Sequence, residues 1–402
     1  MQAAPLSTKI RMTERRIQEW IDWWGEDHVA ISFSGGKDST VLMDIIRYRM
    51  GYKNIPAVFV DVPTQYPELK EFALTWDNVE VLKPKISFMQ VCEKYGFPLV
   101  SKEVSECVQG AKKYFTSLME SDDAMKERLP YSYWYQRVTG TGKYQKNQNK
   151  NYSEGLEELA NILSQNKGHG SNRRTAKMFG MLTKENKIQA NASENDRSNF
   201  SLVQHKYLLE APFDISNKCC DVMKKNPIHE YSRETKRKQI TAQMASESRL
   251  RTQNWLNNGC NIFEAREPIS NPMSFWTEQD VLLYIRENNL PICSVYGEIV
   301  EDWGKTNDVE GQMTISDLEG FEGVEQFDAK QPPLTTTGCK RTGCMLCGFG
   351  CHLEKPGEGR FELLKKTHPK MYALLDVVQN NGWTMRQAIE WMNEHGNLNI
   401  RL

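Results

Sequence analysis

Long apolar runs are missing from this chain, and no stretch approaches the roughly 20 apolar residues that a membrane-spanning helix needs. The first residues, MQAAPLSTKIRM, also lack the apolar core of a secretory signal. An excess of charge of one sign is missing too, because 51 Lys and Arg stand against 52 Asp and Glu, for a formal net charge of −1. These absences predict a cytoplasmic protein without a membrane partner, in which any site for a polyanion is a local patch.

Cysteine is the one reactive residue type that is concentrated. In a reducing cytoplasm, clustered cysteines bind metal or do chemistry more often than they form disulfides. The clustered positions are Cys219 and Cys220, followed much later by Cys339, Cys344, Cys347 and Cys351. The remaining four stand alone, which predicts buried apolar positions: Cys92, Cys107, Cys260 and Cys293.

Hydrophobic periodicity predicts an α/β fold. A helical stripe covers residues 13–24, a strand covers 29–33, and a glycine turn then leads into a second helix and the strand of "IPAVFVDV". Strand, helix and strand at this spacing indicate a parallel, right-handed crossover. Further strands are expected at 79–82 and 238–244, and further helices near 87–95, 104–120, 277–289 and 360–395. We therefore predict a doubly wound, mostly parallel sheet with its ligand at the carboxyl ends of the strands.

Changes in composition suggest three parts. Residues 141–200 are rich in Asn, Lys, Ser and Gly and show little apolar periodicity. We predict a discontinuous nucleotide-binding domain at 1–103 and 205–300, a helical and flexible insertion at 104–204, and a cysteine-rich module with C-terminal helices at 301–402.

The glycine turn is Ser34-Gly35-Gly36-Lys37-Asp38-Ser39. Between a strand and a helix, glycines let the backbone approach an anion, and the free N–H groups of the helix start point at it. Lys37 is expected to neutralise phosphate, Ser34 or Ser39 to donate a hydroxyl hydrogen bond, and Asp38 to cap the helix or help hold Mg²⁺. The spacing is not GxxxxGK[ST], so a Walker-type P-loop is a poor fit.

A strand, SGGKDS and a helix in this order resemble the PP-loop of the adenine nucleotide α-hydrolase superfamily, which includes ATP pyrophosphatases and sulfonucleotide reductases. The resemblance implies ATP with Mg²⁺ as the bound nucleotide. The following "VDVPTQYPELKEF" and "ITAQMASESRLR" are similar to elements of the phosphoadenosine phosphosulfate (PAPS) reductase family. By that resemblance the nucleotide site also includes Asp61, Thr64, Glu247, Ser248 and Arg251, and the catalytic residues are Lys37, Asp38, Ser39 and Arg251. The basic residues between 218 and 251 suggest a phosphate-lined cleft, against the alternative of a solvated basic face.

Two sets of cysteines can provide four thiolates. The C-terminal run C-x₄-C-x₂-C-x₃-C is enough by itself, and four thiolates suit either Zn²⁺ or an iron–sulfur cluster. We expect a [4Fe–4S] cluster, with zinc as the alternative, because structural zinc sites favour two separated pairs. Cys219-Cys220 together with Cys344-x-x-Cys347 resembles instead the cluster ligands of adenylylsulfate reductases, so both ligand sets stay open.

Three functions are compatible with these motifs. The first is an ATP pyrophosphatase that adenylates its substrate for thiolation, because the cysteine-rich segment resembles that of enzymes of DNA phosphorothioation. It implies tRNA or DNA as a partner, and a sulfur donor such as a cysteine desulfurase or an electron donor. The second is a sulfonucleotide reductase, although its usual Cys-Gly-Leu-His nucleophile has no counterpart after Cys351. The third is a non-catalytic nucleotide-binding subunit of a DNA-modification or defence system.

Nucleic acid as a partner has a second, weaker basis in basic and aromatic residues of the insertion. These are Tyr144, Tyr152, Arg173, Arg174, Lys177 and Phe179, and the alternative is a solvated loop. Whether the protein is a homo-oligomer is left open.

Overall fold

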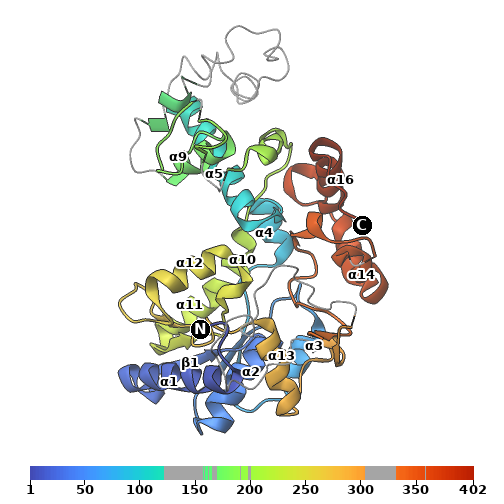
Figure 1. The fold of residues 1–402 in the computed structure, drawn as a ribbon. Helices are drawn as coiled ribbons and strands as arrows, with labels where there is room; N and C mark the ends of the chain where they lie inside the picture. The colour runs from blue at the N-terminus through green and yellow to red at the C-terminus, as the bar shows by residue number, and fades with distance from the viewer. Residues whose placement is uncertain are drawn as a thin grey trace, which may run out of the picture. The chain divides into compact units, whose positions relative to one another are not determined.

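The computed structural model describes residues 1–121, 157, 159–161, 163–164, 170–190, 192–197, 201–303, 332–357 and 359–402. It divides into two compact units (Figure 1). The first unit is Met1–Pro84 with Asn226–Gly343, and the second is Lys85–Lys225 with Cys344–Leu402. The chain passes from one unit to the other after Pro84, Lys225 and Gly343, and the predicted three-part division has its boundaries after residues 103, 204 and 300.

The first unit holds the central sheet. The strands of the first unit, in chain order, are β1 (Val29–Ser32), β2 (Ala57–Val60), β3 (Val79–Leu82), β5 (Lys238–Ile240), β6 (Asn261–Ile262), β7 (Ile269–Ser270), β8 (Ile299–Glu301) and β9 (Leu334–Thr336). Its α-helices are α1 (Leu6–Trp24), α2 (Lys37–Asp44), α3 (Pro67–Ala73), α11 (Asn226–Thr235), α12 (Arg249–Asn258) and α13 (Glu278–Glu287). Single turns lie at η1 (Glu26–His28), η6 (Ala245–Glu247) and η7 (Ser294–Tyr296), and α2 continues as a π-helical turn, η2 (Ile45–Arg49).

Six strands pair in the order β3-β2-β1-β5-β7-β6, and only β6 runs antiparallel to its neighbour. Ile31 of β1 lies opposite Ala57 of β2 on one side and Ile240 of β5 on the other. This confirms the predicted α/β class with a mostly parallel sheet. The chain proceeds from β1 outward to β3 and then returns to the other side of β1 as β5. The carboxyl ends of β1 and β5 therefore meet where the strand order reverses, which is where open parallel sheets bind ligands.

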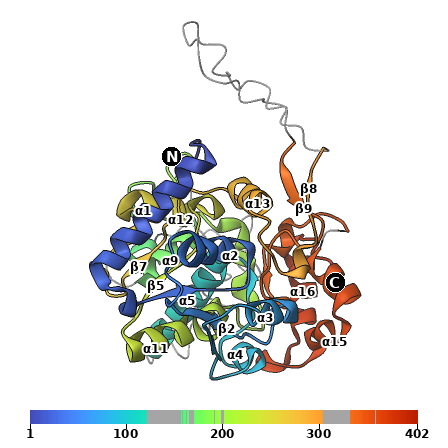
Figure 2. The same cartoon turned by 90° about the horizontal axis from the view of Figure 1, so that it is seen from below.

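Alternation along the strands explains why both faces are covered. Val29 and Ile31 belong to a large apolar core that includes residues of α1, α2 and α13. Ala30 and Val58 point to the opposite face, where Tyr231 of α11 packs against them. In Figure 1, α1, α2 and α13 form the lower layer of this unit and α11 and α12 lie above the sheet, and Figure 2 views the lower layer. With both faces covered, the loops at the strand ends are the polar part of the unit.

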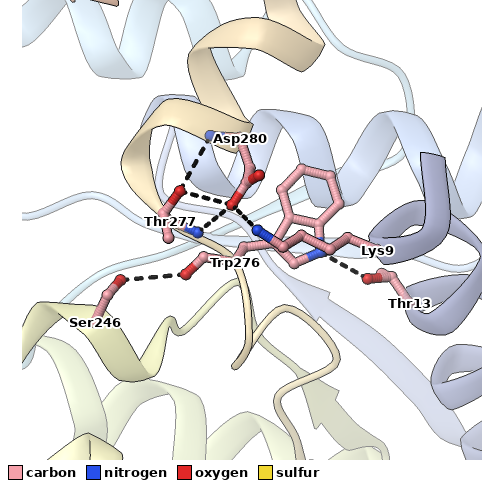
Figure 3. A network of polar contacts seen from close by, with 6 residues as sticks. All are labelled: Lys9, Thr13, Ser246, Trp276, Thr277 and Asp280. Atoms are coloured by element: carbon pink, nitrogen blue, oxygen red, sulfur yellow. Dashed lines mark hydrogen bonds and ion pairs between the residues drawn. The ribbon is translucent and has the colours of Figure 1, made fainter. Parts of the chain in front are cut away.

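A buried polar network fixes α1 to the start of α13 (Figure 3). The ammonium group of Lys9 donates to Asp280 Oδ2 at 2.6 Å, and the Lys9 side chain is 2% exposed. Asp280 also accepts from the backbone N–H of Thr277, whose hydroxyl caps α13. The indole N–H of Trp276 donates to Thr13 Oγ1 at 2.8 Å, and the Trp276 carbonyl accepts from Ser246 at 3.2 Å. The network thus holds both the first turn of α13 and the turn η6 that follows β5.

The second unit is mostly helical. Its longer helices are α4 (Phe88–Tyr95), α5 (Lys102–Ser121), α9 (Gly170–Met178), α14 (Arg360–Thr367) and α16 (Met385–Gly396). Shorter elements are β4 (Leu99–Val100), η4 (Val203–Glu210), α10 (Lys218–Cys220), the π-helical η5 (Asp221–Lys225), β10 (Gly348–Phe349), η9 (Cys351–Leu353), α15 (Pro369–Tyr372), η10 (Ala373–Asp376) and η11 (Asn380–Gly382).

Two long-range links close this second unit. Gly348 of β10 pairs in parallel with Leu99 of β4. The amide side chain of Asn380 accepts from the Asp214 backbone N–H at 2.7 Å and donates to the Cys92 carbonyl at 3.3 Å. Segments from three distant parts of the sequence are therefore packed together around α4. The predicted helical region 360–395 folds as α14, α15 and α16, joined by two single turns.

Part of the predicted insertion falls outside the described residues, including Tyr144 and Tyr152. In the described part of the chain, no helix is both long enough and apolar enough to cross a membrane.

The Lys9–Asp280 pair should be a large contributor to the stability of the first unit. Replacing Lys9 by Met keeps the length of the side chain but leaves the Asp280 carboxylate, which is 12% exposed, without its cation. We expect the free energy of unfolding, measured by urea denaturation, to fall by about 3–5 kcal/mol. The control is Arg286→Met, which breaks an exposed ion pair to Glu301 at 3.4 Å and should cost less than about 1 kcal/mol. Equal effects of the two substitutions would contradict the assigned role of Lys9.

Candidate functional site

The glycine turn follows β1 and enters α2 at Lys37. Gly35 has φ of +70°, and a Cβ built on it would lie 2.8 Å from the carbonyl oxygen of Leu69. A left-handed backbone pressed against another main chain admits glycine and strains any other residue. A Cβ on Gly36 would meet the hydroxyl oxygens of Ser34 at 3.1 Å and Tyr296 at 3.3 Å. The turn thus has the close-packed, side-chain-free surface expected of a phosphate cradle.

The serine hydroxyls of the turn bond within it. Ser34 Oγ and Ser39 Oγ lie 3.0 Å apart, and the Gly36 N–H donates to Ser34 Oγ at 3.3 Å. Ser39 Oγ donates to the Gly36 carbonyl at 2.9 Å. We expected Ser34 or Ser39 to donate a hydrogen bond to phosphate, and in this structure both hydroxyls bond within the loop.

Lys37 is buried, with only 4% of its surface exposed. Its ammonium group forms an ion pair with Glu278 Oε1 at 2.9 Å and donates to the carbonyl oxygen of Lys340 at 2.6 Å. It also lies 5.3 Å from the centre of the Tyr296 ring, a cation–π distance. Glu278 stands in the first turn of α13, so the network around Lys9 indirectly positions the partner of Lys37.

Asp38 is the most unusual acid of the site. Its Oδ1 atom is buried and has no hydrogen-bond partner among the described residues. Burial raises the pKa of the Asp38 carboxyl, while the cations of Lys37, Arg341 and Arg251 act in the opposite direction. A carboxylate oxygen left without a partner next to a glycine cradle fits a Mg²⁺–nucleotide, because Mg²⁺ takes one or two protein carboxylates together with phosphate oxygens.

The residues after β5 contribute a second polar segment. The carboxylate of Glu247 accepts from the Met244 N–H at 3.3 Å and forms an ion pair with Arg251. Ser248 caps α12 by accepting from the Arg251 N–H, so its hydroxyl has a structural role here. Burial and the neighbouring Arg341 both lower the pKa of the Arg251 guanidinium, while Asp38 raises it. Arg251 and Arg341 are thus two cations gathered near one carboxylate.

A small cavity of about 140 Å³ joins these segments. Its walls come from the glycine turn, from Glu247 and Glu278, and from Tyr296, Arg341 and Thr342. Asp61 and Thr64, which follow β2, are not among its walls. Asp61 pairs with Lys70 at 2.7 Å, and the buried Thr64 hydroxyl has no hydrogen-bond partner in the part of the chain that the structure describes.

Sequence reasoning missed Glu278, Tyr296, Lys340, Arg341 and Thr342. The available signal was the basic pair Lys340-Arg341 between two cysteines. Nothing in the sequence indicated that this pair lies over a turn about 300 residues earlier, because the contacts depend on how the chain returns to the sheet.

Cysteine thiols gather separately, in the second unit. The neighbouring Cys220, burial and nearby Cys347 and Cys344 together raise the pKa of Cys219. The pKa of Cys220 is lowered by Cys219 and by lysines that include Lys224.

Lys224 ties these thiols together. Burial lowers the pKa of Lys224, but nearby Cys344 and Cys220 outweigh it and the pKa is raised. Burial raises the pKa of Cys347 to about 11, and Cys344 and Cys220 add to that shift. The thiols of Cys219, Cys220, Cys344 and Cys347 therefore influence one another electrostatically, and the half-buried Lys224 is among the cations near them.

The other two clustered cysteines differ. Cys351 is buried, donates to the Cys347 carbonyl at 3.4 Å, and has its pKa raised to about 12, mainly by burial. Cys339 belongs to the first unit, where its backbone N–H donates to the Val295 carbonyl at 2.8 Å. Among the described residues, no three Cys, His, Asp or Glu side chains form a group spaced to hold a metal ion. The identity of the metal and of its ligands stays a prediction.

The four isolated cysteines are buried, as predicted. Cys92, Cys107, Cys260 and Cys293 are 0%, 3%, 8% and 1% exposed. Burial is the largest influence on each of their pKa values and raises all four.

Comparison with known families now identifies the fold. The model of the phosphoadenosine phosphosulfate reductase domain matches residues 28–127 and 171–348, which is most of the chain. The chain belongs to the PAPS reductase domain family. The resemblance found in the glycine turn and in the segments after β2 and β5 is thereby confirmed at the level of the family.

Two relatives among curated proteins are similar over a short stretch. Both are named "Probable FAD synthase", one from Caenorhabditis briggsae and one from Caenorhabditis elegans, and each is 30% identical over 83 residues. The aligned stretch is 19% of this chain and 16% of each relative. The FAD synthases belong to the same PP-loop superfamily, so they support the fold of the nucleotide site.

The PAPS reductase domain match omits residues 128–170, within the predicted insertion. Just after the omitted residues, two of the basic residues considered for nucleic-acid binding form ion pairs with glutamates of α5. Arg174 pairs with Glu106, and Lys177 donates to Glu103 at 2.8 Å. Lys218 and Lys225 likewise pair with Asp221, at 3.4 and 2.9 Å.

The glycine cradle can be tested with two matched substitutions. Gly35→Ala adds a Cβ that clashes with the Leu69 carbonyl, and Gly51→Ala, at φ +86°, adds one with nothing within 4 Å. In urea denaturation, Gly51→Ala should cost about 1–2 kcal/mol of backbone strain, and Gly35→Ala should cost more because of the added clash with the Leu69 carbonyl. Only Gly35→Ala should also weaken nucleotide binding, measured by equilibrium dialysis. Equal nucleotide affinity of the two variants would show that the turn is not the binding element.

Proposed function

We propose that this member of the PAPS reductase domain family is an ATP pyrophosphatase that adenylates a nucleic-acid substrate for replacement of oxygen by sulfur. The observation that carries the proposal is the buried Asp38 oxygen, which has no hydrogen-bond partner among the described residues and whose carboxyl feels the charges of Lys37, Arg251 and Arg341. A carboxylate in a phosphate pocket repels an anion unless a divalent cation bridges the two. MgATP meets this requirement, whereas a sulfonucleotide bound without metal leaves the carboxylate opposed to its phosphates.

The residues present define roles for the first step. The N–H groups of the glycine turn and the ammonium of Lys37 would bind phosphate oxygens, and Arg251 would balance further charge once Glu247 releases it. Asp38 would hold Mg²⁺, and the bound ion would supply positive charge at the phosphates. A substrate oxygen then attacks the α-phosphorus, the bond between the α- and β-phosphates breaks, and pyrophosphate leaves.

The second step needs a sulfur donor. The substrate oxygen, now carrying AMP, is a good leaving group. The terminal sulfur of a persulfide from a donor protein, such as a cysteine desulfurase, would attack the activated atom and release AMP. A second thiol would then cleave the remaining S–S bond and free the thiolated product.

The gathered thiols support a sulfur-handling centre. A [4Fe–4S] cluster uses four cysteine thiolates, and the ammonium of Lys224 would offset part of its negative charge. The four thiols near Lys224 are not spaced to hold a metal ion in this structure, so binding a cluster would require them to move closer together. Cys219, Cys220, Cys344 and Cys347 would hold the cluster, which when bound supplies a place for sulfur or electrons. Zinc is the alternative occupant of the same thiols.

A sulfonucleotide reductase is the second candidate, favoured by the name of the matching domain. It would take adenylyl sulfate or phosphoadenylyl sulfate and release sulfite. The third candidate, a nucleotide-binding subunit without catalysis, uses the same loop without turnover.

The Lys37 substitution separates these functions. ATP labelled at the α- and γ-phosphates would be incubated with the anaerobically purified protein, tRNA or DNA, and a persulfide donor. We expect AMP and pyrophosphate, at a rate that Lys37→Ala lowers by about 100-fold or more, because a cation at the transferring phosphates is lost. Lys53→Ala, at an exposed position of the same unit, is the control.

Each other outcome has a defined meaning. Unchanged turnover by Lys37→Ala would remove the PP-loop assignment. Sulfite release from a sulfonucleotide would favour the reductase, and nucleotide binding without any turnover would favour the third candidate.

The ligand set can be read from the metal content. Cys219→Ser and Cys344→Ser should each lose most of the iron and acid-labile sulfide after anaerobic purification, while Cys339→Ser and Cys351→Ser keep them. Cys107→Ser, at a buried and isolated position, is the control. Loss of iron in the Cys339 and Cys351 variants would instead assign the C-terminal run, and zinc in place of iron would contradict the cluster.

A further inference from the structure

The segment Lys340–Thr342 lies directly over the glycine turn within the first unit. The carbonyl oxygen of Lys340 accepts from the Lys37 ammonium at 2.6 Å. The hydroxyl of Thr342 lies 2.8 Å from the hydroxyl of Tyr296, which in turn accepts from the Lys37 backbone N–H at 3.3 Å. The Lys37 ammonium is therefore bonded directly to this segment, and the Lys37 backbone N–H is linked to it by way of the Tyr296 hydroxyl.

The segment is itself anchored beside η7. The Gly338 N–H donates to the Tyr296 carbonyl at 2.8 Å, and the Cys339 N–H donates to the Val295 carbonyl at 2.8 Å. Gly338 has no room for a side chain, since a Cβ would lie 2.4 Å from the Val295 oxygen. These main-chain contacts fix where the next three residues begin.

Arg341 is the charged member of this segment and a wall of the same cavity as Lys37 and Asp38. The other cations of the site have carboxylate partners: Lys37 pairs with Glu278, and Arg251 pairs with Glu247. Arg341 forms no ion pair with a residue that the structure describes, although it acts electrostatically on Asp38. An exposed guanidinium at the wall of this cavity, without a carboxylate partner among the described residues, is suited to bidentate binding of phosphate.

We propose that Arg341 binds the phosphates of the nucleotide, and that Lys340–Thr342 is a strap whose contacts with Lys37 are exchanged for contacts with those phosphates. The inference rests on the proposed ATP-binding function and adds a residue and a rearrangement to it. The nucleotide takes over the Lys37 ammonium from the Lys340 carbonyl and the Lys37 N–H from Tyr296.

The exchange predicts opposite effects for two substitutions. Arg341→Ala removes a charge-assisted contact and should raise the dissociation constant for ATP about 10-fold or more. Tyr296→Phe removes the hydroxyl that competes for the Lys37 N–H but keeps the ring beside the ammonium. It should lower the dissociation constant for ATP by about 2–10-fold. Arg341→Lys should recover part of the lost affinity, because the charge returns without the fork.

Binding of ATP, AMP and adenosine would be measured by isothermal titration calorimetry on the full chain with Mg²⁺ present. Both substitutions should change ATP binding most, AMP binding less and adenosine binding least. Arg286→Ala, on the exposed side of α13, is the matched control and should bind all three as the unaltered protein does.

The outcomes separate this inference from the proposed function. If the unaltered protein binds ATP and Lys37→Ala weakens it, but Arg341→Ala does not, Arg341 is not a phosphate ligand and the proposed function stands. Equal loss of ATP and adenosine would also overturn the inference, because it indicates general damage to the site. If Tyr296→Phe weakens ATP binding, the exchange at Lys37 is wrong. No ATP binding by the unaltered protein removes both the function and the inference.

Discussion

The candidate site depends on the contacts of the Lys37 ammonium group. It joins the helix after β1 to Glu278 of α13 and to the main chain at Lys340, and it does so almost wholly away from solvent. A buried cation is tolerated only when its charge and its donors are satisfied. Glu278 and the Lys340 carbonyl meet that requirement, so the three segments must stay together until an anion replaces them. The glycine turn and the helix after it therefore also hold together the segments at the strand ends of the first unit.

The position of Glu278 has its own support. The Lys9–Asp280 pair and the Trp276–Thr13 hydrogen bond fix the first turn of α13 against α1, and Ser246 connects the same network to the turn before α12. Rigid support behind a polar site keeps its charges in place without the cost of ordering them when the ligand arrives. The Glu278 wall of the small cavity is thus supported by the polar network between α1 and α13.

Much of this could be predicted from local sequence. Strand β3 begins and ends at the residues expected, and the isolated cysteines are buried because an unpaired thiol behaves as a small apolar side chain. The turn at Gly35 was recognisable because glycine spacing reflects a backbone need. The strap was not predictable, since Lys340 and Arg341 show only charge in the sequence and their partner is about 300 residues away. The contacts of the Ser34, Ser39 and Ser248 hydroxyls with neighbouring backbone and side chains were not predictable either.

The sequence by itself determined the alternation of strands and helices, the glycine turn and the reservoir of clustered thiols, because each follows from residues within one turn or strand of each other. Only the tertiary structure decided which distant residues meet. It brought Glu278, Tyr296 and Arg341 to the end of β1, and it brought Cys344 and Cys347 to Lys224 and the Cys219-Cys220 pair. The physical reason is that the burial of apolar faces fixes where the helices and strands lie. The polar residues at their ends then form hydrogen bonds and ion pairs with the residues that this packing places beside them.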